Sequence, residues 1–310
     1  MKSSEAEEML VRVGIPSSFS FFTGVAAALG APVLISANAL RRPSRPKFQL
    51  PRPRVFSGCN VALDSAGFVA MSKFGGFPWT VTEYVALALH LERTLGALFS
   101  WWSSMDFCCE PEIAADAAEV LRRQLMTVEY LRLCREEAVH QGAKPPMPVL
   151  QGWTPDDYER CAALMDNLPP LVGVGSVCRR HLHGPAGLLA VMERLHAILP
   201  DHVKLHLFGV KGDGVRALAG HPRLASVDSM AWDLAARNDA RLLKLLLDMR
   251  PDETVYDLAF RARHLRRWYS SQTAALHLDP RHAIRPSACL SGLHPRRKLD
   301  GGKRRRLLCA

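Results

Sequence analysis

The sequence predicts an α/β protein: a (β/α)8 TIM-like barrel followed by a basic C-terminal helical or tail extension. Three observations support this fold class. The chain has 310 residues, 48% of them hydrophobic, and can therefore bury one barrel-sized core. Short apolar runs rich in β-branched residues alternate with helical patterns, which favours a closed barrel over an open doubly wound sheet. Polar residues recur where these strands end, and in a barrel those ends share one face.

Composition divides the chain into three expected parts. We expect residues 1–16 to be a polar lead-in that begins a short amphipathic helix, residues 17–275 to form the barrel, and residues 276–310 to form the basic tail. Residues 30–38 have the pattern of a buried strand followed by a loop. The basic stretch 41–54 is expected to be a surface loop, because its prolines lack backbone donors and fix φ.

Strands and helices then alternate along the chain. A strand ends at Asp64, and the Gly- and aromatic-rich residues 74–79 form a loop. Thr154 opens a helix, because a threonine cap, Pro155 and acids in the first turn are all helix-start signals. Further strands are expected at 97–106, 148–152, 171–177, 203–210 and 224–228, and further helices at 82–95, 113–141, 185–199, 239–250 and 255–271, with a loop at 211–214 before a short helix. Seven strands are legible, so the eighth must be assumed.

The formal net charge of +10 is concentrated at the C-terminal end. Residues 261–310 hold thirteen Lys or Arg and two acids, and residues 41–54 form a second basic cluster without any acid. Basic clusters suit a polyanion, because each phosphate contact releases counterions. The alternative is a solvated tail whose charge keeps the chain soluble. The residues expected to contact nucleic acid are Arg41, Arg42, Arg45, Lys211, Arg304 and Arg305.

Composition argues against a membrane protein and against a disulfide framework. The most apolar segment, residues 19–37, is interrupted by Gly24, Gly30 and Pro32, so no membrane span is expected and a cytoplasmic location follows. The eight cysteines are scattered, and several lie in apolar runs where a thiol behaves as a small hydrophobic side chain. We therefore expect reduced thiols.

Two segments end a strand in an aspartate. Residues 224–232 present Asp228 at the end of a short apolar run, and residues 61–68 present Asp64 in the same way. Displacement at a sugar carbon requires two carboxylates, one that attacks and one that moves protons. Either aspartate alone could instead cap a helix or pair with a cation, so the prediction depends on both lying at one face of the barrel.

Four segments carry a resemblance to the tRNA-guanine transglycosylases. Asp64-Ser-Ala-Gly-Phe68 is similar to their Asp-Ser-Gly-Gly-Phe signature, and Val149-Leu-Gln-Gly152 is similar to their Val-Gln-Gly strand. Phe208-Gly-Val-Lys-Gly212 resembles their Met-Gly-Val-Gly loop, and Val227-Asp-Ser-Met-Ala-Trp232 resembles the nucleophile segment of the archaeal members. Order and spacing match over residues 20 to 240, approximately. The chain resembles most the shorter branch that inserts 7-deazaguanines into DNA in bacteria and phages.

The resemblance implies a role for each aspartate. Asp228 would attack C1′ of a guanosine unit and hold it as a covalent glycosyl-enzyme while guanine leaves. Asp64 would act as general acid and base. Asp106 would accept hydrogen bonds from the ring N–H and the amine of the base, and Gln151 would donate to the base carbonyl. The remaining residues expected at the substrate are Ser65 and Phe68, with the backbone of Gly175, Ser176 and Val177 closing the pocket.

Two features depart from the family pattern. The family has Gly-Gly-Leu where this chain has Gly175-Ser-Val177. The Cys-x-Cys-x-x-Cys zinc motif is absent, so no cofactor is expected. Zinc bound by Cys289, His294 and Cys309 stays open as an alternative, although their spacing fits no standard ligand pattern. Because the tRNA enzymes use the zinc subdomain with their RNA, its loss favours a different nucleic acid.

The sequence thus predicts a guanine transglycosylase, a pentosyltransferase that exchanges guanine in DNA for a 7-deazaguanine, with the 7-cyano form as the expected base. A helicase or ATPase that opens the duplex is a candidate partner. Three alternatives stay open: the same exchange on tRNA, a barrel glycoside hydrolase that uses Asp64 and Asp228, and a non-catalytic barrel that binds nucleic acid. Cys108 and Cys109 follow Asp106 closely and suggest a thiol nucleophile, but buried core residues explain them more simply.

Overall fold

The structure is a computed structural model that describes residues 9–16, 19–42, 45–56, 58–178, 180–250 and 252–276. Of the predicted basic tail it describes Leu276. The predicted nucleic-acid contacts Arg304 and Arg305, and the zinc candidates Cys289, His294 and Cys309, lie outside the described residues. No helix within the described part of the chain is long and apolar enough to cross a membrane.

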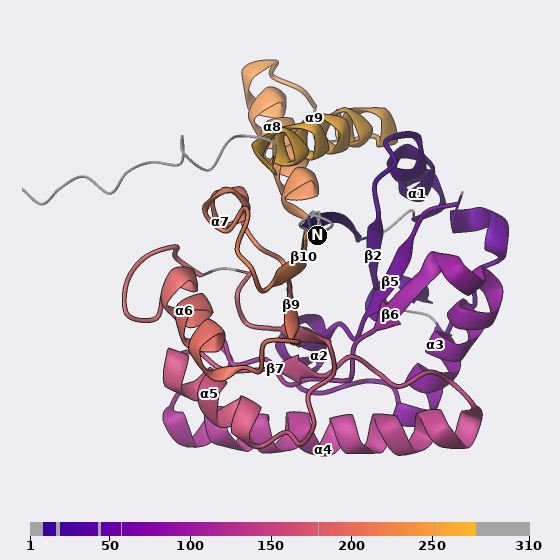
Figure 1. Cartoon of the computed structure of the whole chain (residues 1–310). Helices are drawn as coiled ribbons and strands as arrows, with labels where there is room; N and C mark the ends of the chain where they lie inside the picture. Colours follow the sequence, from indigo (N-terminus) through magenta and orange to yellow (C-terminus); the bar gives the residue numbers. More distant parts are fainter. Residues whose placement is uncertain are drawn as a thin grey trace, which may run out of the picture.

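The core of the fold is one sheet of eight parallel strands in the order β6-β5-β2-β1-β10-β9-β8-β7. The sheet curls on itself and helices lie around its outside (Figure 1). Its strands are β1 (Leu10–Ile15), β2 (Val33–Ser36), β5 (Val61–Asp64), β6 (Phe99–Trp102), β7 (Val149–Leu150), β8 (Leu171–Val174), β9 (Lys204–Leu207) and β10 (Leu224–Ser229). The α/β alternation is therefore confirmed.

The helices follow the predicted sequence of elements closely. They are α1 (Phe19–Ala28), α2 (Gly67–Phe74), α3 (Val81–Leu95), α4 (Ala117–Gln141), α5 (Pro155–Ala163), α6 (Leu188–Ile198), α7 (Gly212–Ala217), α8 (Ala231–Leu246) and α9 (Leu258–Leu276), with 3-10 turns η1 (Ala37–Leu40), η2 (Pro53–Phe56) and η3 (Gly96–Leu98). The helix start at Thr154 is confirmed: its side chain and that of Asp157 form a reciprocal capping box. Helices α1 and α2 were not predicted, and α8 begins at Ala231, before the predicted start at residue 239. At the start of α2, Ala66 has a φ of 66° and no capping side chain.

The eighth strand lies in the segment predicted to be a lead-in. Residues Leu10–Ile15 form β1, which pairs with β2 on one side and with β10 on the other. Five of its six positions are buried, because both faces of a central strand in a parallel sheet are covered. The expectation that residues 1–16 lie outside the barrel is therefore wrong for Leu10–Ile15, because β1 joins the two halves of the sheet.

The predicted closed barrel is met only in part. Between the edge strands β6 and β7 the pairing reduces to one parallel bridge, Ser103 with Met147. Two hydrogen bonds make it, from Met147 N to the Trp102 carbonyl and from Ser104 N to the Met147 carbonyl, each 2.8 Å. Pro145, the alternate position before Met147, has no N–H to donate, so the hydrogen-bonded ladder toward β6 does not extend in that direction. The sheet is TIM-like and curled, but it is not a fully paired barrel.

The basic proline-rich stretch is also more regular than predicted. Its first part forms a two-stranded antiparallel sheet, β3 (Arg41–Arg42) and β4 (Arg45–Phe48), in which Arg41 pairs with Phe48. Pro46 lies within β4, which is tolerated because a two-stranded sheet consists only of edge strands. The expectation of a loop without regular structure is therefore wrong for Arg41–Arg42 and Arg45–Phe48.

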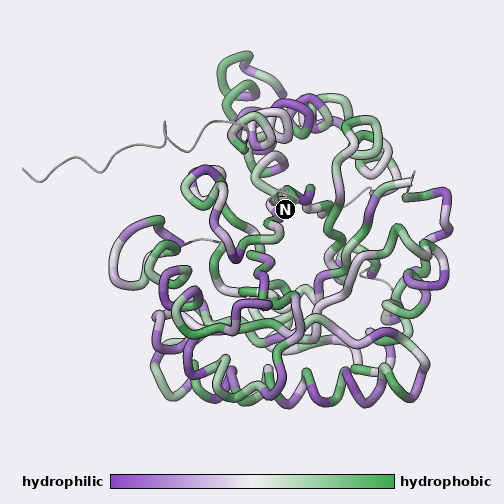
Figure 2. Tube along the Cα trace, in the orientation of Figure 1, coloured by the Kyte–Doolittle hydropathy of each residue, from purple (hydrophilic) through white to green (hydrophobic). Residues whose placement is uncertain are grey.

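Two hydrophobic cores lie between the sheet and the helices. In the first, Val33 and Ile35 of β2 pack with Phe22 of α1 and Leu87 of α3. In the second, strands β8 and β9 pack against α5 and α6. Figure 2 shows hydrophobic and hydrophilic residues alternating along α4, as expected for a helix with one side on the sheet. Alternate strand positions point to the inside of the curled sheet, where the carboxyl ends of the strands surround a pocket.

Candidate active site

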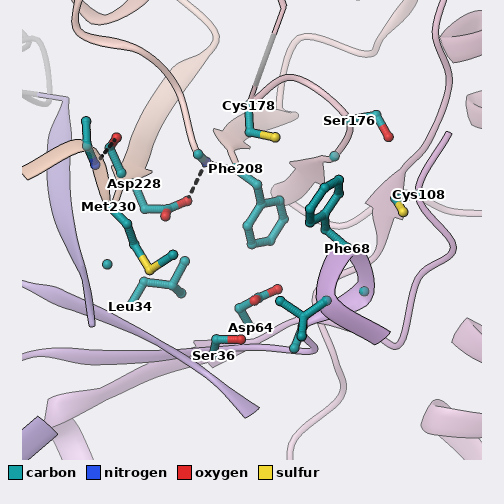
Figure 3. Close-up of a pocket in the computed structure, with 18 of the residues that line it drawn as sticks. Leu34, Ser36, Asp64, Phe68, Cys108, Ser176, Cys178, Phe208, Asp228 and Met230 are labelled. Carbon is teal, nitrogen blue, oxygen red and sulfur yellow. Dashed lines mark hydrogen bonds between the residues drawn. The ribbon is translucent and has the colours of Figure 1, made fainter. Parts of the chain in front are cut away.

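A pocket of about 420 Å³ opens at the carboxyl ends of the strands. This is within the size range of small-molecule sites. Asp64 and Asp228 both point into it, from different sides (Figure 3). The structure therefore brings the two predicted catalytic carboxylates together, although β2 and β1 separate their strands in the sheet. The predicted residues that line the pocket are Asp64, Phe68, Asp106, Gln151, Gly175, Ser176, Lys211 and Asp228.

Asp64 ends β5 beside Ser36, its register partner in β2. Its environment raises the pKa to about 7, first because burial penalises the charged carboxylate, then because Asp106 and Asp228 repel it. Hydrogen bonds from the Ala66 backbone and the Ser36 side chain oppose this increase. A carboxyl group that titrates near neutral pH can donate a proton in one step and accept one in the next.

Asp228 ends the apolar run of β10 and is held by the loop after β9. Gly209 N donates to Asp228 Oδ1 at 2.9 Å, and Val210 N donates to the Asp228 carbonyl, also at 2.9 Å. Gly209 has a φ of 69°, a conformation that favours glycine. Only 6% of Asp228 is exposed, so its carboxylate is reached from the pocket alone. This combination of fixed orientation and limited access suits a nucleophile.

Asp106 lies beyond β6 and is fully hydrogen-bonded on both oxygens. Ser65 Oγ donates to Oδ1 at 2.6 Å, and Gln151 Nε2 donates to Oδ2 at 2.5 Å. Burial raises the pKa of Asp106 to about 6 in spite of these donors. Gly67 allows the close approach, because a Cβ at that position would lie 2.5 Å from the Asp106 carbonyl oxygen.

Gln151 continues this hydrogen-bond chain to Ser176 and Glu110. The Ser176 hydroxyl lies 2.7 Å from Gln151 Oε1 and 2.9 Å from Glu110 Oε2, so its single proton can serve only one of them at a time. Cys109 N donates to the same hydroxyl at 2.7 Å. Gly175 has no room for a side chain, since a Cβ would lie 2.1 Å from Gln151 Nε2. The floor of the pocket is therefore one connected polar network.

Some predicted site residues lie elsewhere. Ser65 is buried and reaches the pocket only through its hydrogen bond to Asp106. The side chain of Val177 packs in the second core. Arg41 lies over the ring of Trp79, 5.3 Å from its centre, and is not among the residues that line the pocket. The backbones of Arg42 and Arg45 pair in the β3–β4 sheet.

Sequence reasoning missed several residues at the site. Glu110 lines the pocket. It follows Asp106 by four residues, and in the sequence it resembles part of an ordinary acidic loop. No motif in the sequence marks Ser36. It could have been found only by aligning the strand that precedes Asp64 with the Asp64 strand, which places Ser36 opposite Asp64. Cys108 also lines the pocket, and burial raises the pKa of its thiol far above the usual range. The protonated thiol is a poor nucleophile, so the carboxylates are the better candidates.

The described residues offer no group of three or more His, Cys, Asp or Glu side chains placed to hold a metal ion. The side chains present therefore do not fit the family's zinc site within this part of the chain. The six described cysteines are free thiols, and five of them are buried.

The fold is TIM-like, and its pocket brings two aspartates together at the carboxyl ends of the strands. A family model described as DpdA, DeoxyPurine in DNA protein A, matches residues 24–275. The chain belongs to this family, the branch of the tRNA-guanine transglycosylase superfamily that inserts 7-deazaguanines into DNA. The resemblance carried by the four sequence segments is thereby confirmed. Among curated proteins, none matches the chain.

Asp64→Asn is expected to stabilise the protein at alkaline pH. Because folding raises the pKa of Asp64 from 3.8 to about 7, Asp64 lowers stability progressively as pH rises through that interval. Removal of the charge should raise the free energy of unfolding by roughly 1–3 kcal/mol at about pH 8, and by nothing measurable below about pH 4. Urea unfolding at both pH values measures the difference. The exposed Asp166→Asn is the matched control, and an equal gain at both pH values for Asp64→Asn would contradict the assignment.

Proposed function

We propose that the protein exchanges guanine in DNA for a 7-deazaguanine through a covalent intermediate on Asp228. The observation that carries the proposal is the pair of aspartates in one pocket, one fixed by a backbone N–H and the other titrating near pH 7. The family match supports DNA as the substrate and a transferase as the class. The pentosyltransferase reaction and the 7-cyano form of the incoming base are our proposals.

In the first half of the reaction, a carboxylate oxygen of Asp228 forms a bond to C1′ of a deoxyguanosine. The bond from C1′ to guanine N9 breaks, and its electron pair leaves with the base. Protonated Asp64 supplies a proton to the leaving guanine, which departs neutral. A pKa of about 7 leaves a large part of Asp64 protonated at neutral pH, as this step requires.

In the second half, a 7-deazaguanine takes the place of guanine. Asp64, now ionised, accepts the proton from N9–H of the incoming base, and N9 attacks C1′. The ester bond to Asp228 breaks and its carboxylate is restored. One glycosidic bond is exchanged for another of similar energy, so the reaction needs positioning and electrostatic stabilisation but no energy source.

The polar network at the pocket floor would recognise the base. The Asp106 carboxylate suits the ring N–H and amine of guanine, because that edge offers only donors. Gln151 Nε2 has a second hydrogen for the base carbonyl, and the Ser176 proton can turn toward Glu110 or Gln151 as the bound base requires. Phe68 extends into the pocket from α2 and would stack on the base (Figure 3).

The rim of the pocket would carry the DNA strand. Lys211 and Arg237 line it with positive charge, while Met230 and Leu234 are 42% and 57% exposed beside them. Cations at the rim suit phosphates, and exposed apolar side chains suit the bases next to an extruded nucleotide. Arg41 of the β3–β4 sheet, together with Arg42 and Arg45, is proposed to contact the strand farther from the pocket. A helicase or ATPase that opens the duplex stays a candidate partner.

Nucleoside mass spectrometry of cellular DNA tests the function. Cells that make 7-deazaguanines and express the wild-type protein should contain a modified deoxyguanosine in their DNA, and Asp228→Asn should abolish it because the nucleophile is lost. Asp166→Asn, a surface change, should leave the modification at the wild-type level. Modification of tRNA with unmodified DNA would favour the tRNA alternative, and release of free sugar by the purified protein would favour a glycoside hydrolase.

Asp106→Asn tests the recognition of the base. Asparagine keeps the shape but loses the charge and presents donors to an edge of guanine that offers donors. The KM for the incoming base should rise by about 10- to 100-fold, the amount expected for hydrogen bonds to a charged group. Exchange of labelled guanine into DNA at varied base concentration measures this. An unchanged KM with a reduced kcat would assign Asp106 to the chemical step instead.

A further inference from the structure

A layer of buried polar and aromatic side chains lies beneath the pocket, inside the curled sheet. Arg12 of β1 and His206 of β9 are 3% and 0% exposed. The Arg12 guanidinium lies 5.3 Å from the centre of the Trp101 ring, and the ring centroid of His206 is 4.7 Å from that of Trp101. Phe208, which lines the pocket, packs edge-on against His206 with centroids 4.6 Å apart. His206 is therefore fixed between two aromatic rings directly below the site.

The two nitrogens of His206 face different groups. Nδ1 lies 2.8 Å from Ser226 Oγ. Nε2 is buried, makes no hydrogen bond within the described residues, and lies 3.5 Å from Oδ1 of Asp228. A bare nitrogen lone pair facing a carboxylate oxygen would be repelled, so the proton belongs on Nε2. Ser226 then donates its hydroxyl proton to Nδ1, which fixes this tautomer.

Burial keeps the imidazole of His206 neutral, and the nearby charge of Arg12 adds to this effect while it attracts the carboxylate of Asp228. Arg12 is the register partner of Asp228, and its side chain donates to Asn60 Oδ1 at 2.8 Å and to Ser100 Oγ at 3.2 Å. Burial lowers the pKa of Arg12 to about 10, so it stays charged at neutral pH. Burial and the charge of Arg12 lower the pKa of His206, while Asp228 raises it, and the net direction is downward.

We propose that His206, oriented by Ser226 and backed by Arg12, is a positioning residue that holds Asp228 through Oδ1 and turns Oδ2 toward C1′ of the substrate. This inference rests on the proposed function. Oδ1 already accepts from Gly209 N at 2.9 Å, so a second donor at Nε2 would leave only the other oxygen to attack. A contraction of about half an ångström would bring Nε2 to hydrogen-bond distance, and such contacts often shorten when substrate binds.

The same two donors serve both halves of the exchange. When Asp228 Oδ2 bonds to C1′, Oδ1 becomes the carbonyl oxygen of the ester and still accepts from Gly209 and His206. When the incoming base displaces the ester, the negative charge returns to Asp228 and meets donors already in place. Because these donors need no reorganisation, they lower the barrier more than water would.

Single-turnover exchange with DNA that carries labelled guanine tests the inference. His206→Phe keeps an aromatic ring between Trp101 and Phe208 but has no donor, and it should lower the rate of guanine release by about 10- to 100-fold with the KM for DNA and base unchanged. His206→Gln restores an N–H and should recover part of the rate. Trp102→Phe is the matched control and should keep the wild-type rate, because this neighbouring tryptophan of β6 packs in the first core on the opposite side of the strand.

The outcomes separate this inference from the proposed function. Suppose that the wild type releases guanine and that Asp228→Asn abolishes this release. A wild-type rate in His206→Phe would then overturn the role of His206 and leave the proposed function intact. Equal losses in the Phe and Gln variants with a raised KM would assign His206 a merely structural role. Nitrogen NMR of the wild-type imidazole is an independent measurement that needs no activity: the proton is expected on Nε2, and a proton on Nδ1 would overturn the inference even if no exchange occurred.

Discussion

Enclosure of several carboxylates in one pocket is the constraint on which the rest of the site depends. Asp64, Asp106 and Glu110 face the same cavity as Asp228, and burial there opposes ionisation of the first two. The protein offsets this cost with donors at fixed places: Ser65 and Gln151 for Asp106, and the Gly209 N–H for Asp228. Asp64 has hydrogen bonds from the Ala66 backbone and the Ser36 side chain, but burial and the repulsion from Asp106 and Asp228 outweigh them and raise its pKa to about 7. Burial and repulsion thus raise the pKa of both Asp64 and Asp106, and the proposed reaction uses Asp64 to carry protons and the other carboxylates to bind or attack.

The alternation of strands and helices could be predicted because each strand is a short apolar run followed by turn residues and a capped helix, as Thr154 and Asp157 illustrate. Three features of the sheets could not. The strand Leu10–Ile15 follows the acidic residues Glu5, Glu7 and Glu8, so the pattern predicts a polar lead-in, whereas Arg12 of this strand is buried inside the sheet. The closure of the barrel at Met147 depends on pairing between segments that are distant in sequence rather than on local pattern. The β3–β4 sheet places a proline on an edge, where it costs little.

The pocket residues that lie at strand ends could be predicted from the sequence. The residues that act through a second side chain could not. Asp64, Asp106, Gln151 and Asp228 follow strands directly, so topology alone brings them together. Glu110 lines the pocket but joins the polar network through Ser176, and His206 reaches the site through Asp228; both partners lie far away in sequence. Ser176, which replaces a glycine of the family pattern, has a φ of 53°, and its hydroxyl contacts with Cys109, Gln151 and Glu110 hold this otherwise unfavourable conformation. The departure from the family pattern has therefore become part of the polar network.

The most direct measurement of the central claim is the identity of the residue that holds the sugar. Purified protein would be incubated with guanine-containing DNA without an incoming base, then denatured, digested and analysed by peptide mass spectrometry. The account predicts a deoxyribose attached to the peptide that contains Asp228, and more of it below pH 7 than well above it, because protonated Asp64 assists the departure of guanine. A sugar attached to Asp64 or to another residue, or guanine exchange that proceeds without any covalent adduct, would contradict it.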